Sequence, residues 1–356
     1  MTELAEKRRR LHALLASLDL DALVLRRPAN VAWYSGGGRT HVLAVQETGV
    51  AAVVVRRDGD EVVVPVNEAA RLEEEELAVL GARFRVVGWD ADLAAELPRG
   101  PRVGWDVPTD GTRDVAAALE DARRALTPDE LERYRALGAD AAVALTDALL
   151  LLEPGRSERA AAASAARACL ERGIDPVVLL VAGEERLPRH RHPLPTDAVL
   201  GRLAMVVVCA RRSGLVASLT RFVAFGPLAP ELRDAEEPLL QVDAAFNRAT
   251  RAGVRVGEAF ADGTRAYGEH GFAADEWRRH HQGGPTGYEP RDYLATAASE
   301  PLVCDGQAFA WNPSVPSLKC EDTVVATTGL PEVLTVDPRW PTRVVDGLAR
   351  PLVLER

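Results

Sequence analysis

Two short segments of this sequence gather residue types suited to acid/base chemistry. Residues 188–195 form a charged segment bounded by prolines, and residues 280–292 combine histidines with glycines that let the backbone approach a ligand closely. Histidine can move protons at pH 7, and arginine can bind a carboxylate through two hydrogen bonds. The first segment can equally be a polar surface loop, and the second a structural turn. The candidate side chains are His190, His192, His281, Tyr288, Arg291 and Asp292.

The elements around these segments predict two domains, residues 1–124 and 125–356. Near the junction, Thr127 and Glu130 match a capping box and Pro128 suits a first helical turn. The first domain alternates helices with short apolar strands, which is typical of an α/β fold. The second has the order helix, helix, strands twice over, which indicates a duplicated α+β half. Its strands include residues 203–209, where Cys209 is expected to pack. Other predicted elements are a strand at residues 42–45 and a helix at residues 238–250.

Composition narrows the class of protein. The 356 residues are 47% hydrophobic and 27% charged, which predicts a folded core, and the net charge of −10 argues against nucleic-acid binding. Only Lys7 and Lys319 are lysines among 43 basic residues, so arginine is the default cation here. No signal peptide, membrane span or disulfide framework is recognisable, and we expect a cytoplasmic protein without a membrane partner. Nucleotide-binding glycine motifs and the HExxH and GxSxG signatures are absent.

Five short motifs between residues 127 and 324 resemble, in their order, peptidase family M24, in the branch of creatinase, Xaa-Pro dipeptidase and aminopeptidase P, and the resemblance covers nearly the whole chain. The resemblance implies a creatinase-type α/β N-terminal domain followed by a pita-bread α+β domain. Each motif is weak alone, and their order and spacing make the resemblance specific. The motifs lie at residues 127–131, 218–221, 281–284, 310–313 and 321–324.

The family's metal-dependent members hold two divalent ions with two aspartates, one histidine and two glutamates. Only one of these five carboxylate or imidazole ligands remains here, and valine and proline offer no side-chain donor. The resemblance therefore implies a chain without a metal cofactor. The matching positions are Val207, Ser218, Pro285, Asn312 and Glu321.

The metal-independent branch, creatinase above all, uses a histidine as its acid/base. The spacing of seventeen residues before Val207 favours His190, with His192 close enough to take its place. Glu321 then orients the acid/base or binds a cationic group, and Arg291 holds a substrate carboxylate. Creatinase itself carries a glutamate where Thr220 stands, which argues against creatine as substrate. The other implied substrate-binding residues are Tyr288, Asp292, Trp311, Asn312, Ser218 and, from a partner subunit of a homodimer, Arg39.

Three functions follow from this pattern. The leading hypothesis is a metal-independent, homodimeric enzyme that acts on a small amino- or imino-acid-type molecule by C–N hydrolysis or elimination. The second is a binding protein of the same fold without catalysis. The third is a metallopeptidase with a rebuilt site of five residues. Those residues are His190, His192, His281, Asp292 and Glu321.

Overall fold

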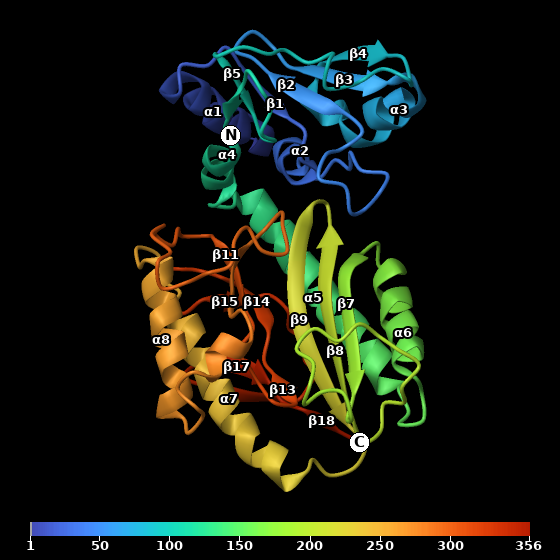
Figure 1. The fold of residues 1–356 in the computed structure, drawn as a ribbon, viewed down its shortest axis with the longest axis vertical. Helices are drawn as coiled ribbons and strands as arrows, with labels where there is room; N and C mark the ends of the chain where they lie inside the picture. The colour runs from blue at the N-terminus through green and yellow to red at the C-terminus, as the bar shows by residue number, and fades with distance from the viewer. Residues whose placement is uncertain (1) are drawn as a thin grey trace. The chain divides into compact units, whose positions relative to one another are not determined.

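The computed structural model describes residues 2–356 and divides the chain into two compact units, drawn in Figure 1. The first comprises the chain up to Asp129 together with Ser213–Leu215, and the second comprises Glu130–Arg212 and Val216–Arg356. The predicted boundary after residue 124 lies in the connection between helix α4, which ends at Arg123, and helix α5, which begins at Pro128. Among the described residues, no helix has the length and apolar content that crossing a bilayer requires.

The first unit is built on a mixed six-stranded sheet in the order β4-β3-β2-β1-β5-β6. Strands β1 and β2 are buried along their whole length, as their unbroken apolar sequences predict. The strands are β1 (Ala22–Leu25), β2 (Ala52–Val55), β3 (Glu61–Pro65), β4 (Arg83–Val87), β5 (Val103–Trp105) and β6 (Arg113–Asp114). The helices are α1 (Glu3–Ser17), α2 (Pro28–Ser35), α3 (Val66–Arg71) and α4 (Ala116–Arg123), with short turns at Leu72–Glu76 and Ala78–Leu80.

The strand predicted at residues 42–45 is wrong. This segment forms turns and pairs with no strand, and its apolar side chains face solvent, with Val45 95% exposed. A short apolar run predicts a strand only where a neighbouring strand can satisfy its backbone, and here none lies alongside.

The second unit consists of two similar halves, each with two helices and a sheet. In the first half α5 (Pro128–Leu150) and α6 (Glu158–Leu170) accompany β7 (Asp175–Gly183), β8 (Leu203–Arg212) and β9 (Leu215–Ala224), which join β18 (Leu354–Glu355) in the order β18-β9-β8-β7. In the second half α7 (Pro230–Ala249) and α8 (Val256–Glu269), labelled in Figure 1, accompany a sheet in the order β10-β11-β14-β15. Its strands are β10 (Gly283–Thr286), β11 (Ala308–Trp311), β14 (Asp322–Val325) and β15 (Glu332–Val333). Two hairpins and a 3-10 turn complete the unit: β12 (Ser314–Val315) with β13 (Leu318–Lys319), β16 (Thr342–Val345) with β17 (Leu348–Pro351), and Glu276–Arg279.

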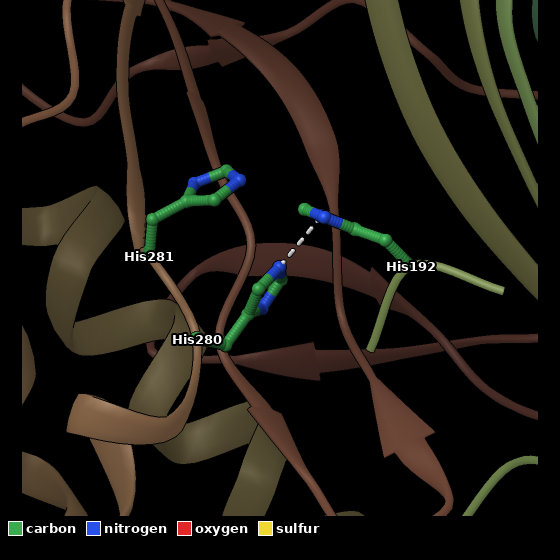
Figure 2. A group of neighbouring side chains, drawn as sticks. All are labelled: His192, His280 and His281. Atoms are coloured by element: carbon green, nitrogen blue, oxygen red, sulfur yellow. Dashed lines mark hydrogen bonds between the residues drawn. The ribbon is translucent and has the colours of Figure 1, made fainter. Parts of the chain in front are cut away.

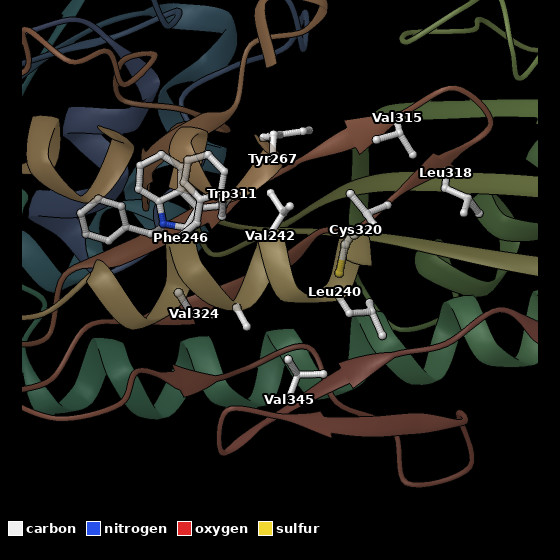
Figure 3. Packing of buried hydrophobic residues seen from close by; sticks show 14 of the residues in the cluster. Leu240, Val242, Phe246, Tyr267, Trp311, Val315, Leu318, Cys320, Val324 and Val345 are labelled. Carbon is white, nitrogen blue, oxygen red and sulfur yellow. The ribbon is translucent and has the colours of Figure 1, made fainter. Parts of the chain in front are cut away.

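Helix α7 begins eight residues before its predicted start and runs through Pro238. A proline inside a helix removes one backbone hydrogen bond, so the sequence favoured a start at this residue. The apolar face that follows, including Val242 and Phe246, packs into the main core and stabilises the longer helix. Figure 3 shows Phe246 beside Trp311 of β11, whose ring centroid lies 4.9 Å away.

Gly283, at the start of β10, has a conformation that only glycine tolerates. Its φ is +92°, and a Cβ atom there would lie 2.1 Å from the carbonyl oxygen of Ala310 in the neighbouring strand. We expect Gly283→Ala to lower the free energy of unfolding by about 1–3 kcal/mol or more, measured by urea denaturation. Gly287→Ala is the matched control, because nothing lies within 4 Å of its Cβ position. Equal stability of the two variants would contradict this account of β10.

Candidate functional site

Glu321 is the buried acidic centre of the site. It lies immediately before β14 and is 2% exposed. Its Oε1 accepts a hydrogen bond from Arg291 at 2.8 Å, and its Oε2 accepts from Lys319 Nζ and Thr220 Oγ1, both at 2.7 Å. Burial raises the pKa of this carboxyl, but the charges of Lys319 and Arg291 outweigh burial and lower it to about 2. Glu321 is therefore a carboxylate at neutral pH, held by two cations.

Arg291 connects Glu321 to strand β9. Its Nη1 donates to Ser218 Oγ at 3.2 Å and to the carbonyl of Pro290 at 2.5 Å, while its side chain is 11% exposed. The buried Nε has no hydrogen-bond partner. A buried N–H without a partner is costly, so this donor is suited to an incoming acceptor such as a carboxylate oxygen.

Strands β9 and β14 are joined side by side at the site. Thr323 Oγ1 accepts from the backbone N–H of Ser218 at 2.7 Å and donates to the carbonyl of Ser218 at 3.0 Å. The N–H of Thr220 donates to the carbonyl of Glu321 at 3.0 Å. Because alternate residues of a strand share a face, this pairing brings the Ser218 and Thr220 hydroxyls to Arg291 and Glu321.

Three histidines form a second group. Figure 2 shows the rings of His192, His280 and His281 turned toward one another, and their ring centroids lie 4.6–5.2 Å apart. Nε2 of His280 lies 2.9 Å from Nε2 of His192, and its Nδ1 lies 3.1 Å from Ser314 Oγ. Burial, followed by the charge of Lys319, lowers the pKa of His280 to about 2. Burial and the charge of Arg291 lower the pKa of His281 to about 4, so both rings are neutral at pH 7.

The carboxylate and the histidines belong to one site. Ser314, the partner of His280, faces Lys319 across the β12–β13 hairpin, and Lys319 binds Glu321. The charge of Lys319 also lowers the pKa of His192, after burial. The hairpin contacts therefore connect the ammonium and the carboxylate to the imidazoles, and charge effects are strongest between such close groups.

Comparison with known proteins identifies the family. A sequence model of metallopeptidase family M24 matches residues 132–328, which is more than half of the chain, and one of the creatinase/prolidase N-terminal domain matches residues 7–157. The chain belongs to metallopeptidase family M24. A search of curated proteins found no match.

Solved structures share the fold of this family M24 chain. The prolidase from Pyrococcus horikoshii OT3 is 17% identical with a TM-score of 0.79, covering 94% of this chain and 99% of that one. Dipeptidase PepE from Mycobacterium ulcerans is 21% identical with a TM-score of 0.75, covering 95% and 97%. The N-terminal domain of FACT complex subunit SPT16 from chickpea, Cicer arietinum, is 15% identical with a TM-score of 0.69, covering 94% and 96%. The predicted creatinase-type α/β domain and pita-bread α+β domain are thus confirmed.

The residues that the resemblance matches to the family's metal ligands do not fit a pair of divalent ions. Val207 and Pro285 are buried within strands β8 and β10 and offer no side-chain donor. Asn312 Oδ1 and Ser218 Oγ are neutral donors, and the one carboxylate, Glu321, is neutralised by Lys319 and Arg291. Two ions of charge +2 need several anionic oxygens, which this set does not provide.

The structure brings together only part of the predicted site. His192 joins the histidine group, whereas His190 is exposed and lines a small cavity beside Ser314 and Lys319. The spacing that favoured His190 over His192 could not resolve two positions in one irregular loop. The predicted residues that meet are His192, His281, Glu321, Arg291, Ser218 and Thr220.

The predicted aromatic walls lie elsewhere. Trp311 is 1% exposed, stacks on Phe246 and donates its Nε1–H to Thr250 Oγ1 at 2.8 Å, so it belongs to the core. Tyr288 is buried, and its hydroxyl donates to Glu130 of α5 at 2.7 Å. An aromatic residue in a strand or turn can face either side, and the sequence alone does not decide which.

The other three predicted residues, Arg39, Asp292 and Asn312, make contacts of their own outside the ion pairs of Glu321. Arg39, in the first unit, is 62% exposed and pairs at 2.8 Å with Glu76, whose side chain is 5% exposed. Asp292 is half-buried, and its N–H donates to the carbonyl of Pro285 at 2.9 Å. Asn312 is buried with its Oδ1 unbonded, and its N–H donates to the carbonyl of Gln282 at 3.0 Å, beside the histidines.

Sequence analysis missed Lys319 and His280. The sequence held one signal for Lys319, because lysine is rare in this arginine-rich chain. In the structure both lysines are buried, Lys7 at 0% and Lys319 at 9% exposure. A compact ammonium on a flexible stem fits such positions where a planar guanidinium does not. His280 lay beside His281, which the family resemblance favoured because it fills the first place of an HxxGH motif, and nothing in the sequence set His280 apart.

Proposed function

We propose that this member of family M24 is a metal-independent enzyme that acts on a small amino- or imino-acid-type molecule by histidine acid/base chemistry. The reaction class is C–N hydrolysis or elimination, and we expect a cytoplasmic homodimer. The observation that carries the proposal is the Lys319–Glu321–Arg291 arrangement beside neutral histidines. It keeps a charged, orienting carboxylate close to groups that can accept protons.

The cations suit an anionic substrate group. Arg291, Lys319 and Glu321 carry a net charge of +1, counting the guanidinium and the ammonium against the carboxylate. A substrate carboxylate can receive the unbonded Nε–H of Arg291 while Ser218 Oγ lies beside Nη1. The low exposure of these groups strengthens each interaction, because little water competes.

The histidines supply the proton transfers. For hydrolysis, a neutral imidazole accepts a proton from water as the water oxygen bonds to the substrate carbon. The protonated imidazole then gives that proton to the nitrogen as the C–N bond breaks, so no net proton is gained or lost. His192 and His281 are the candidates, and the His280 Nδ1 contact with Ser314 Oγ holds the third ring in place.

The test uses full-length protein stripped of metal with a chelator. N-acyl amino acids, Xaa-Pro dipeptides and guanidino acids that raise its melting temperature are incubated with it, and products are followed by mass spectrometry. We expect turnover without added metal, and a loss of about 100-fold or more in His281→Ala. His270→Ala, which alters a histidine at the end of α8, should leave the rate unchanged. Turnover only after addition of Mn²⁺ or Co²⁺ would contradict metal independence, and binding without turnover would favour a binding protein.

A further inference from the structure

The three histidines have the spacing of a metal-binding group. One ring nitrogen from each of His192, His280 and His281 lies within 4.8 Å of the other two. Zn–N bonds of about 2.0–2.1 Å in a tetrahedral site place ligand nitrogens about 3.3 Å apart, and small side-chain rotations cover that difference. Nε2 of His192 and Nε2 of His280 are already 2.9 Å apart. The rings come from the loop between β7 and β8 and from the segment preceding β10, and they converge in Figure 2.

The polar groups next to the histidines resemble those that orient the side-chain ligands of a metal ion. Ser314 Oγ, 3.1 Å from His280 Nδ1, can accept the Nδ1–H, which leaves the Nε2 lone pair directed into the group. The buried Nδ1 of His281 and Oδ1 of Asn312 have no hydrogen-bond partner. A buried ring nitrogen without a partner calls for an explanation, and a bound ion supplies one for His281.

We propose that His192, His280 and His281 bind one divalent ion of the zinc, copper and nickel group. Three imidazoles without a carboxylate favour these ions over Mn²⁺, Mg²⁺ and Ca²⁺, which prefer oxygen donors. This site differs in donors and in number of ions from the carboxylate-held pair of metal-dependent members of family M24. It also differs from the rebuilt five-residue site considered from the sequence, because His280 takes part and His190, Asp292 and Glu321 do not.

Nearby positive charges and solvent access at His192 favour weak, reversible binding of the ion. Lys319 and Arg291 repel a cation, while Glu321 offsets only one of their charges. The side chain of His192 is exposed, so an ion can enter from solvent and keep a water as fourth ligand. Under the proposed function, a bound ion also occupies the lone pairs that accept protons, so it inhibits turnover. That consequence, unlike the binding itself, rests on the proposed function.

The experiment titrates metal-free, full-length protein with Zn²⁺ against a chromophoric chelator, and with Co²⁺ followed by its visible absorption. We expect one equivalent of Zn²⁺ per chain and no saturable binding of Mn²⁺. Affinity should fall at least tenfold in His280→Ala and in His192→Ala, the latter a change at an exposed side chain that leaves the fold intact. Ser314→Ala should weaken binding about 10-fold, as loss of an orienting contact does.

The matched control is His270→Ala, which should bind Zn²⁺ like the wild-type protein. Zn²⁺ bound equally by wild type and His192→Ala, or Mn²⁺ bound as tightly as Zn²⁺, would overturn the proposal. Binding is measured without substrate, so its failure leaves the proposed reaction standing. Conversely, if the protein binds one Zn²⁺ through these histidines but turns over no substrate, the metal site is supported and the proposed reaction is contradicted.

Discussion

Glu321→Gln is expected to lower the free energy of unfolding by about 3–5 kcal/mol and to abolish turnover. Glutamine preserves the shape of the side chain and removes its charge. Lys319 and Arg291, whose side chains are only 5% and 11% exposed, then lose the carboxylate that neutralises both. Two like charges in a region of low dielectric repel each other and are poorly hydrated. Urea denaturation at pH 7 measures the loss, with turnover of the identified substrate as the second readout.

A second substitution tests whether the stability lost in Glu321→Gln comes from uncompensated charge or from altered packing. Adding Lys319→Met to Glu321→Gln removes one uncompensated cation, so the double variant should recover part of the lost stability. Glu332→Gln is the surface control, because Glu332 pairs with Arg135 where both side chains are 39% or more exposed, and it should cost about 1 kcal/mol or less. A Glu321→Gln protein as stable as the Glu332→Gln protein would contradict this electrostatic account.

These charges give a physical reason for the altered metal positions. Glu321 remains at the one carboxylate position that survives, and a buried carboxylate needs compensating positive charge. Lys319 and Arg291 supply that charge from the protein itself. Glu321 therefore stays ionised through its ion pairs with Lys319 and Arg291, and its charge does not depend on bound divalent ions. Lysine suits this position in an arginine-rich chain, because its compact ammonium shares Oε2 with the Thr220 hydroxyl in a confined space.

The sequence predicted the fold better than the site. Helix starts such as Pro128 and buried strands such as residues 203–209 follow from local capping and hydrophobicity, which act within a few residues. The contacts of Glu321 depend on β9 and β14 lying side by side, about 100 residues apart in sequence. Motif spacing identified Glu321 and Arg291, because the family resemblance encodes that long-range pairing. It could not choose between His190 and His192, since an irregular loop has no period that fixes which side chain turns inward.

Arg350 holds together a buried ionic network in the core behind the site. Its side chain is fully buried, with Nε 2.6 Å from Asp243 Oδ2 and Nη2 3.0 Å from Asp322 Oδ2. Arg350→Met should therefore lower the free energy of unfolding by about 3–5 kcal/mol, because the buried carboxylate of Asp243 loses its ion-pair partner and Asp322 keeps only Arg221. Thermal and urea denaturation measure it. Arg343→Met, on the neighbouring strand β16, is the control: Arg343 is 52% exposed, and its ion pair with Glu237 should contribute about 1 kcal/mol or less.

The effect of Arg350→Met should also depend on pH in a defined direction. Burial raises the pKa of Asp243 to about 6, with Arg350 opposing and Asp322 reinforcing the shift; Cys320 and Asn247 are its other polar neighbours. An unfolded aspartate has a pKa of about 3.9, so the folded protein binds more protons between about pH 4 and 6. Stability from this group rises as pH falls through that window, by up to about 1.4 kcal/mol per pH unit, and is lost as pH rises through 6.

Without Arg350, the pKa of Asp243 rises further and the same window extends upward. The stability difference between wild type and Arg350→Met should therefore be smaller at pH 5.5 than at pH 8, because the protonated carboxyl no longer needs a cation. Comparing the two proteins at each pH cancels the titration of carboxylates that Arg350 does not contact, and Asp322, its other partner, keeps its ion pair with Arg221 in both proteins. A difference that stays constant from pH 5.5 to 8 would mean that Arg350 stabilises the core through the packing of its side chain, and that the charge of Asp243 contributes nothing measurable.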